Sequence, residues 1–194
     1  MFDRRLGWVA LLALATACGG DSTSPGDGGT PGEDLHFLRP SSDAPALAES
    51  SVTFWVSRDH GGQGSIWYHR RDSGSDSTEF VRFEVPDQSI AADSVQITMT
   101  VVDPARMVVQ FEPAGLTFAA DRPARLELKY AEADGDLNDD GLVDAVDDAL
   151  KLTLSIWRQE QPGDPWVKVP SVSVELEDDV RADIFGFTRY AIAY

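Results

Sequence analysis

The sequence predicts a mainly β protein, an Ig-like antiparallel β-sandwich with one short helix. Three observations lead to this prediction. Short runs of β-branched and aromatic residues alternate with polar residues along most of residues 50–194. Clusters of Gly, Pro, Asp and Ser separate these runs at short intervals. One stretch near residue 145 instead has its apolar residues at helical spacing. Many short strands with such spacing favour two packed sheets.

The first segment, residues 1–17, has the pattern of an export signal. Arg4 and Arg5 precede an apolar run that is too short to span a membrane. At its end, Leu14-Ala15-Thr16-Ala17-Cys18 resembles the lipoprotein box of bacteria. The resemblance implies that Cys18 is lipidated and anchors the protein to the cell envelope. Gly19, in place of Asp, implies the outer membrane.

Cys18 is also the only cysteine of the chain, so it has no partner for an internal disulfide. A lipidated cysteine accounts for it, and the alternative is a cysteine in an ordinary cleaved signal. Residues 18–49 then form the lipidated cysteine and a tether, since Gly, Ser, Thr, Pro and Asp dominate its first half. The predicted domains are therefore the signal peptide 1–17, the tether 18–49 and the sandwich 50–194.

The charge of the chain limits its partners. It has 16 Lys and Arg against 33 Asp and Glu, a net charge of −17. Loss of residues 1–17 would make it about −18. Such a charge argues against nucleic acid and against an anionic membrane surface as partners. The membrane contact that we expect is the one through Cys18.

The predicted strands fall in two groups, before and after an acid-rich stretch. The first group comprises residues 51–57, 65–69, 79–85, 94–102, 107–111, 116–118 and 124–130. The second group comprises residues 154–160, 166–169, 171–176 and 189–194. Each run is rich in residues that favour strands, and turn-forming residues bound most of them.

The acid-rich stretch at residues 136–147 has the spacing of a calcium loop. Oxygen-bearing side chains occupy its positions 1, 3, 5, 9 and 12, Gly141 occupies position 6, and Leu142 at position 7 offers its backbone carbonyl. Glycine suits the bend there because it adopts a positive φ without steric cost. Val143, at position 8, is expected to face the protein. The predicted side-chain ligands of Ca²⁺ are Asp136, Asn138, Asp140, Asp144 and Asp147.

A helix is expected to follow this loop, with Asp144 as its N-cap. Its expected apolar face consists of Ala145, Val146, Ala149, Leu150 and Leu152. Loop and helix together, at about residues 132–152, then form an insertion between two strands of the sandwich. The alternative is a solvated acidic linker, because Asp-Gly pairs are ordinary turn sequences. Mg²⁺ fits less well than Ca²⁺, since it requires a tighter octahedral shell.

Two resemblances extend this interpretation. Residues 136–147 resemble one dockerin-type calcium repeat, which implies the ligand roles given above, but a dockerin has two repeats, so binding of a cohesin partner does not carry over. Residues 108–118, 123–126, 166–167 and 187–191 are similar to the β-sandwich domain of ankyrins and netrin-receptor tails, which also occurs in bacterial surface lipoproteins. Some relatives of that domain cleave themselves at a His-Phe-Ser step. Gly186-Phe187-Thr188 stands here and lacks the histidine, so we expect no self-cleavage.

Other candidate groups point to structure rather than catalysis. His36, His60 and His69 lack metal-ligand spacing, and the acids at residues 175–179 are expected to form a solvated charged face. The tryptophans are expected in the core, except Trp55, whose phase along its strand turns it outward. We therefore expect a non-enzymatic, calcium-binding, lipid-anchored envelope protein. The alternative is a carbohydrate- or surface-polymer-binding module that uses exposed aromatics. A surface polymer or another envelope protein is the expected partner.

Overall fold

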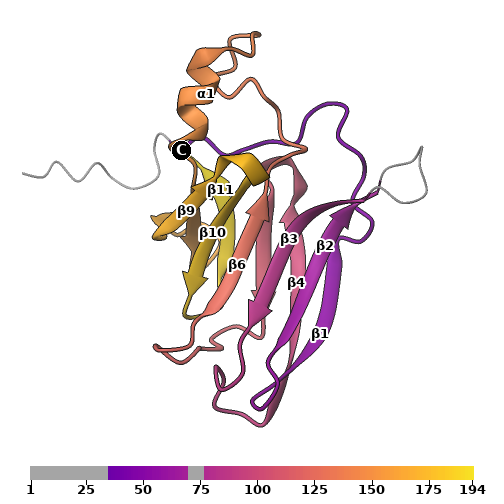
Figure 1. The fold of residues 1–194 in the computed structure, drawn as a ribbon, viewed down its shortest axis with the longest axis vertical. Coiled ribbons are helices and arrows are strands. Elements are labelled where there is room, and N and C mark those ends of the chain that lie inside the picture. Colours follow the sequence, from indigo (N-terminus) through magenta and orange to yellow (C-terminus); the bar gives the residue numbers. More distant parts are fainter. Residues whose placement is uncertain (1–34, 70–76) are drawn as a thin grey trace, which may run out of the picture.

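A computed structural model describes residues 35–69 and 77–194 of the chain. The predicted signal peptide, Cys18 and the start of the tether lie outside the described residues. Figure 1 shows two antiparallel sheets packed face to face, with α1 at one end of the sandwich. The prediction of a mainly β sandwich with one short helix is confirmed. In the two described ranges, no helix has the length and apolar character needed to cross a membrane.

The two sheets contain six and five strands. The six-stranded sheet has the order β1 (Ser51–Ser57), β4 (Ser94–Asp103), β5 (Val108–Glu112), β11 (Arg189–Ala193), β7 (Ser155–Gln159) and β8 (Val167–Lys168). The five-stranded sheet has the order β2 (Gly62–Tyr68), β3 (Thr78–Val85), β6 (Ala124–Lys129), β10 (Asp179–Ile184) and β9 (Ser171–Val174). Helix α1 (Ala145–Lys151) lies between β6 and β7 in the chain, and short 3-10 turns cover Pro104–Arg106 and Glu175–Glu177. Successive strands repeatedly change sheet, so the core is closed by contacts between distant parts of the chain.

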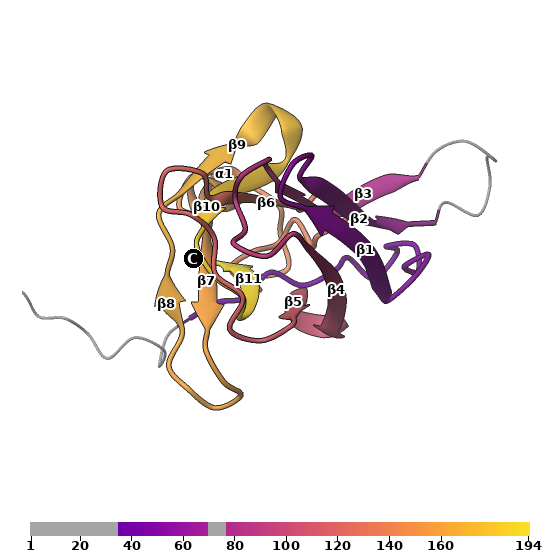
Figure 2. The same ribbon diagram turned by 90° about the horizontal axis from the view of Figure 1, so that it is seen from below.

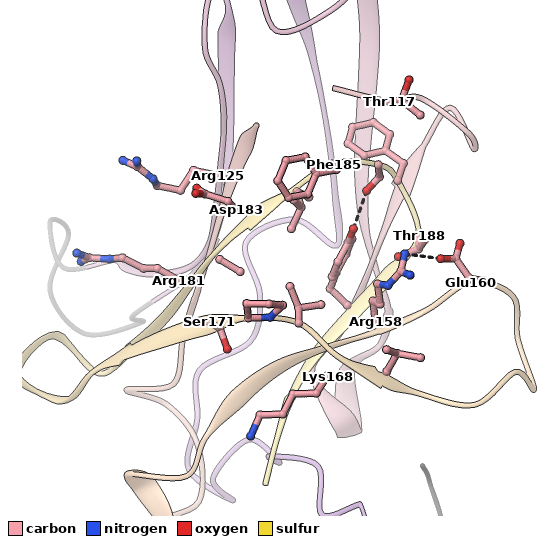
Figure 3. A pocket seen from close by; sticks show the side chains of 18 of the residues that line it. Thr117, Arg125, Arg158, Glu160, Lys168, Ser171, Arg181, Asp183, Phe185 and Thr188 are labelled. Carbon is pink, nitrogen blue, oxygen red and sulfur yellow. Dashed lines mark hydrogen bonds and ion pairs between the residues drawn. The ribbon is translucent and has the colours of Figure 1, made fainter. Parts of the chain in front are cut away.

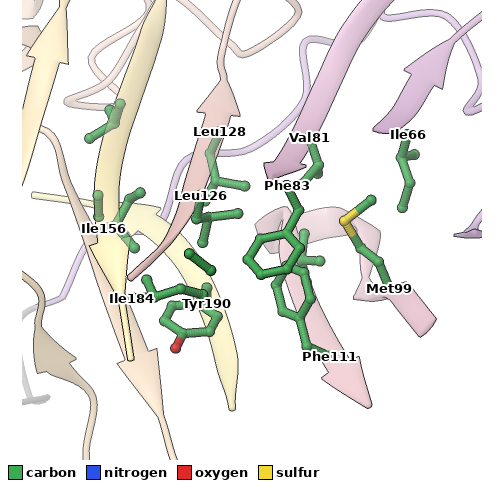
Figure 4. Close-up of a cluster of buried hydrophobic side chains, with 14 of the residues drawn as sticks. Ile66, Val81, Phe83, Met99, Phe111, Leu126, Leu128, Ile156, Ile184 and Tyr190 are labelled. Carbon is green, nitrogen blue, oxygen red and sulfur yellow. The ribbon is translucent and has the colours of Figure 1, made fainter. Parts of the chain in front are cut away.

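The core lies between the sheets, where the inward residue of each alternating pair is buried (Figure 4). Its centre is aromatic. The ring of Phe83 from β3 lies 4.7 Å from that of Phe111 on β5, and Phe187 lies 5.2 Å from Phe111. Tyr190 is 2% exposed, and its hydroxyl donates a 2.6 Å hydrogen bond to the carbonyl of Gly186. Burying such rings contributes about 1.5–3 kcal/mol each, so this cluster holds the two sheets together.

Two strand predictions differ from the structure. Residues 116–118 form only an isolated bridge, between Thr117 and Gly186. Strand β10 was not predicted at all, although it is paired on both sides, with β6 and β9. Its sequence alternates charged residues outward with Val180, Ala182 and Ile184 inward, all of them buried. The period of two was present, but the charges at every other position concealed it.

The predicted tether extends too far into the folded part. Residues 35–49 are described, and they pack on the sandwich. Leu38 is 2% exposed, its N–H donates to the carbonyl of Ile192, and His36 exchanges two backbone hydrogen bonds with Tyr194. The boundary at residue 50 is therefore wrong, and the folded part begins by residue 36. Leu38 is the signal that marks this segment, because a core-filling leucine is out of place in a solvated tether.

Candidate functional site

The acid-rich loop between β6 and α1 curls around its own side chains. The two carboxylate oxygens of Asp136 accept hydrogen bonds from the N–H groups of Asp140, at 3.1 Å, and Gly141, at 2.7 Å. The side chain of Asn138 donates to Asp140 at 2.9 Å and accepts from the N–H of Asp140 at 3.1 Å. Asp140 in turn accepts from the N–H of Leu142 at 2.9 Å. Gly141 has φ of +86°, as expected for the bend of a calcium loop.

Asp147 joins the two ends of this loop. One of its oxygens accepts from the N–H groups of Leu137, at 2.8 Å, and Asn138, at 3.4 Å, while the other accepts from the N–H of Asp144 at 2.8 Å. These hydrogen bonds lower the pKa of Asp147 although burial acts in the opposite direction, and the bond from the N–H of Asp144 has the largest effect. Its side chain is 0% exposed because its own loop covers it. Position 12 of the loop is therefore an ionised carboxylate held at the centre.

Asp144 begins helix α1, as predicted. Its carboxylate accepts from the N–H of Val146 at 2.7 Å, and with Asp147 it forms a reciprocal capping box. Among the predicted ligands, the structure thus links Asp136, Asn138, Asp140 and Asp147 through the loop amides and places Asp144 at the helix start. Their acidic oxygens are turned toward backbone N–H groups rather than gathered at one point.

The expected apolar face of α1 is wrong. Val146 and Leu152 are 51% and 67% exposed, and Val143, expected to face the protein, is 66% exposed. The reason is that α1 projects from the end of the sandwich (Figure 1), so that no sheet lies beneath these side chains. In this element, the buried side chain is the carboxylate of Asp147.

The loop is fastened to the sandwich at two points. The hydroxyl of Tyr194 donates to the carbonyl of Leu137. Arg39, in the segment that precedes β1, lies 3.4 Å from the carboxylate of Asp139, and its carbonyl accepts from the N–H of Asp134 at 2.8 Å. The start of the folded chain and the acidic loop are therefore neighbours.

A second acidic group lies on the outer face of the five-stranded sheet. Within the described part of the chain, Glu127, Glu177 and Asp179 form the only group of three His, Cys, Asp or Glu residues whose ligand atoms lie within 4.8 Å of one another. Arg181 already occupies its centre. The guanidinium lies 3.1 Å from Glu127 and 2.7 Å from Asp179, and it also contacts Glu177. A cation is thus supplied by the chain itself, and this group needs no metal.

Asp179 is 0% exposed, so the expected solvated face at residues 175–179 is wrong for this residue. Burial, together with the neighbouring Glu127, raises the pKa of Asp179 to about 6. Burial acts on Glu127 too, but the hydrogen bond from Asp179 and the charges of Arg181 and Lys129 outweigh it and lower the pKa of Glu127. Below about pH 6 the proton of this pair therefore resides on Asp179.

The remaining candidates are dispersed. His36, His60 and His69 are exposed, and His36 stacks on Tyr194. Trp157 and Trp166 are only half-buried, so the expectation that they lie in the core is wrong. Trp55 is 65% exposed, which confirms that it points outward, and Trp67, which was also expected in the core, is 36% exposed. These two tryptophans belong to β1 and β2, which lie in different sheets. They do not form the single aromatic plane that a sugar-stacking surface requires.

Comparisons with known proteins do not place this arrangement in a family. No family model, no curated protein and no solved structure matches the chain.

Proposed function

We propose that this chain is a non-enzymatic, calcium-binding protein, anchored to the outer membrane of the cell envelope through a lipid on Cys18, in which Ca²⁺ orders the loop between β6 and α1. The observation that carries the calcium site is the closed loop. Asp136, Asn138 and Asp140 bond to amides around Gly141, while Asp147 ties the loop ends together. The closed loop supports the proposal, and binding of Ca²⁺ would turn the acidic oxygens from the backbone N–H groups toward one point.

The donor set fits the ion. Four carboxylates, one amide oxygen and the carbonyl of Leu142 are hard oxygen donors, which Ca²⁺ prefers and which it takes in six- to eightfold coordination. Ionised carboxylates at this density also repel one another, so that a bound cation removes an electrostatic cost. Asp144 and Asp147 have a second role, because they cap α1. We infer that Ca²⁺ and the helix stabilise each other through these two residues.

The resemblance to the ankyrin- and netrin-receptor-type sandwich belongs to the same proposal. It supplies a scaffold rather than a reaction, and the partner that fits it is an envelope component, either a polymer or a protein. The role of Ca²⁺ is then structural. It holds a strand connection in place on a domain outside the cytoplasm, where the ion is plentiful.

Thermal unfolding with Ca²⁺ and with excess chelator tests the proposal. An ion present at a hundredfold excess over its Kd adds about 2.7 kcal/mol. For a domain of this size the unfolding midpoint should rise by about 5–10 °C. The double change Asp140→Ala, Asp144→Ala should abolish that rise. It should also lower the unfolding free energy by about 1 kcal/mol with or without Ca²⁺, because Asp144 caps the helix.

Asp148→Asn serves as the matched control, because Asp148 neighbours the ligand Asp147 but occupies no ligand position. It should keep the full response to Ca²⁺. A midpoint that is the same with Ca²⁺ and with chelator in the unmodified protein would show that the loop is an acidic linker. If Mg²⁺ at equal concentration raises the midpoint as much as Ca²⁺ does, the site does not have the larger coordination shell of Ca²⁺, and the assignment to Ca²⁺ would be wrong.

A further inference from the structure

A largely apolar groove opens on the sandwich at the side of β8, β9 and β10, and Figure 3 shows the side chains that line it. It arises where the chain crosses from the six-stranded sheet to the five-stranded sheet at Pro170. The crossing is fixed by the N–H of Val169, which donates to the carbonyl of Ile156 at 2.8 Å, and by the hydroxyl of Ser171, which accepts from the N–H of Ile156 at 3.1 Å. Strand β8 has only two residues and β9 only four, so these edge strands leave the core partly uncovered.

The floor of the groove is part of the hydrophobic core. Val169, Ala182, Ile184 and Phe187 line it, and each is at most 7% exposed. Around it stand Val167, Val172 and Phe185, which are 46%, 66% and 53% exposed. The cavity volume is about 1180 Å³, beyond the ~300–1000 Å³ of most small-molecule pockets. Exposed apolar side chains gathered around such a hollow mark a binding surface.

The charge around the groove is opposite to that of the protein. Acids outnumber bases 33 to 16 in the chain, whereas Arg125, Arg158, Lys168 and Arg181 line the groove against Glu160 and Asp183. Arg158 pairs with Glu160, and Arg181 is held by the acidic group described above. That leaves two cations without an ion pair and one acid, Asp183, which is the cross-strand neighbour of one of them.

These two cations are Arg125 and Lys168. The side chain of Arg125 forms no ion pair or hydrogen bond with the described residues, and it is exposed. The ammonium of Lys168 only lies over the ring of Trp157, 5.9 Å from its centre. Both lie at the margin of an apolar floor, where they complement an anion attached to an apolar body.

The polar groups of the floor are already engaged. Tyr190 donates its hydroxyl to Gly186 at 2.6 Å, and Thr188 donates to the carbonyl of Arg189 at 3.2 Å. The hydroxyl of Ser171 accepts from the backbone of Ile156. The hydroxyls of these three residues thus bond within the chain, and the apolar floor beside them suits an aliphatic chain, which needs no hydrogen-bond partner.

We propose that the groove binds an amphipathic anion, a long acyl chain with a carboxylate head group. The chain lies on Val169, Ala182 and Ile184, and the carboxylate is held by Arg125 or Lys168. This site is separate from the calcium loop and does not depend on it.

Equilibrium dialysis of the full chain carrying Cys18→Ser against radiolabelled laurate below its micelle concentration tests the proposal. Laurate should bind saturably in the presence of chelator as well as of Ca²⁺. Dodecanol, which has the same chain without the charge, should bind about tenfold more weakly, because it lacks the contact with a cation. Acetate should not bind, because it has no chain.

Two variants separate the contributions of chain and head group. Arg125→Gln with Lys168→Gln should lower laurate affinity about tenfold and leave dodecanol unchanged. Val172→Asp, at a side chain exposed enough to be changed without unfolding, should weaken both ligands. Arg58→Gln, at an arginine outside the groove lining, is the matched control and should change neither.

Absence of saturable laurate binding would overturn the proposal, as would laurate binding that Val172→Asp leaves intact. Binding of an oligogalacturonate that laurate does not displace would assign the groove to an acidic polysaccharide instead.

Discussion

The shared proton of Asp179 and Glu127 predicts an unusual pH dependence of stability. The perturbation is Asp179→Asn, which keeps the size of the side chain and removes its charge. The amide group is able to donate to Glu127 and to accept from Arg181, so it preserves both contacts of the protonated carboxyl. Any change in stability then reports the cost of ionising Asp179 in its buried position.

The magnitude follows from the pKa. In the folded protein the pKa of Asp179 is raised from 3.8 to about 6. A raised carboxyl pKa contributes stability below the unfolded value, and that stability is lost as the pH rises through the folded value. The shift corresponds to at most about 3 kcal/mol. Since Glu127 shares the proton, we expect the unfolding free energy to fall by only about 1–2 kcal/mol between about pH 4 and pH 7.

Glu127 acts in a different pH window. Its pKa is lowered from 4.5, so its contribution is present above that value and is lost as the pH falls through the lower folded value. Above pH 4.5 the ionisation of Asp179 therefore determines how the stability contributed by this pair changes with pH. The unfolding free energy attributable to this pair should fall from pH 4.5 to pH 7 in the unmodified protein, and this fall should be absent in Asp179→Asn.

Urea unfolding at pH 4.5, 5.5, 6.5 and 7.5 in the presence of chelator measures the effect. The loop carboxylates contribute equally to the unfolding free energies of the unmodified protein and the variant, so their contribution cancels in the difference between the two. Near pH 4.5 the two should be about equally stable, and at pH 7.5 the variant should be more stable by about 1–2 kcal/mol. Asp183→Asn, at an exposed position on the same strand, should show no such difference. A variant that is less stable than the protein at pH 7.5 would mean that the ion pair with Arg181 outweighs burial, contrary to the reasoning above.

Two further predictions concern packing and anchoring. Gly64→Ala should lower the unfolding midpoint by several degrees, because the added Cβ would lie 2.4 Å from the ring of Phe54, and overpacking of this kind costs about 1–3 kcal/mol. Gly186→Ala is the control and should change the midpoint little, because the nearest atom to its Cβ lies at 3.4 Å. Equal midpoints for the two variants would contradict the packing argument. Cys18→Ser should abolish incorporation of labelled fatty acid in the producing bacterium and release the protein into the aqueous phase of a detergent partition. Retention in the detergent phase would refute the anchor.

The strands that the sequence predicted well are those in which apolar alternation is plain, as in β1 and β4. In β1 the alternation even gave the direction of Trp55. Strand β10 was missed because Asp179, Arg181 and Asp183 occupy its outward positions, and charge at every second residue resembles a loop. Tertiary contacts explain the pattern: Arg181 lies in an ion network that only the neighbouring strand β6 completes.

The candidate site divides in the same way. Local features were predictable, since the cap at Asp144 and the bend at Gly141 depend on a few adjacent residues. The exposure of Val146 and Leu152 was not, because it depends on where α1 projects from the sandwich. The groove could not be predicted from the sequence either. It depends on the crossing at Pro170 between sheets whose strand order joins distant segments.

The hydrogen bonds between the start of the folded chain and β11 determine how the domain carries mechanical load. Force applied at residue 35 meets first the paired backbone bonds of His36 and Tyr194, then the bond from Leu38 to Ile192. The next contacts, those of Arg39 with Asp134 and Asp139, lead into the acidic loop. Tension from a tether would therefore reach the loop before it reaches the aromatic core. A cation held there, as proposed, would stiffen the attachment at the point where the load enters.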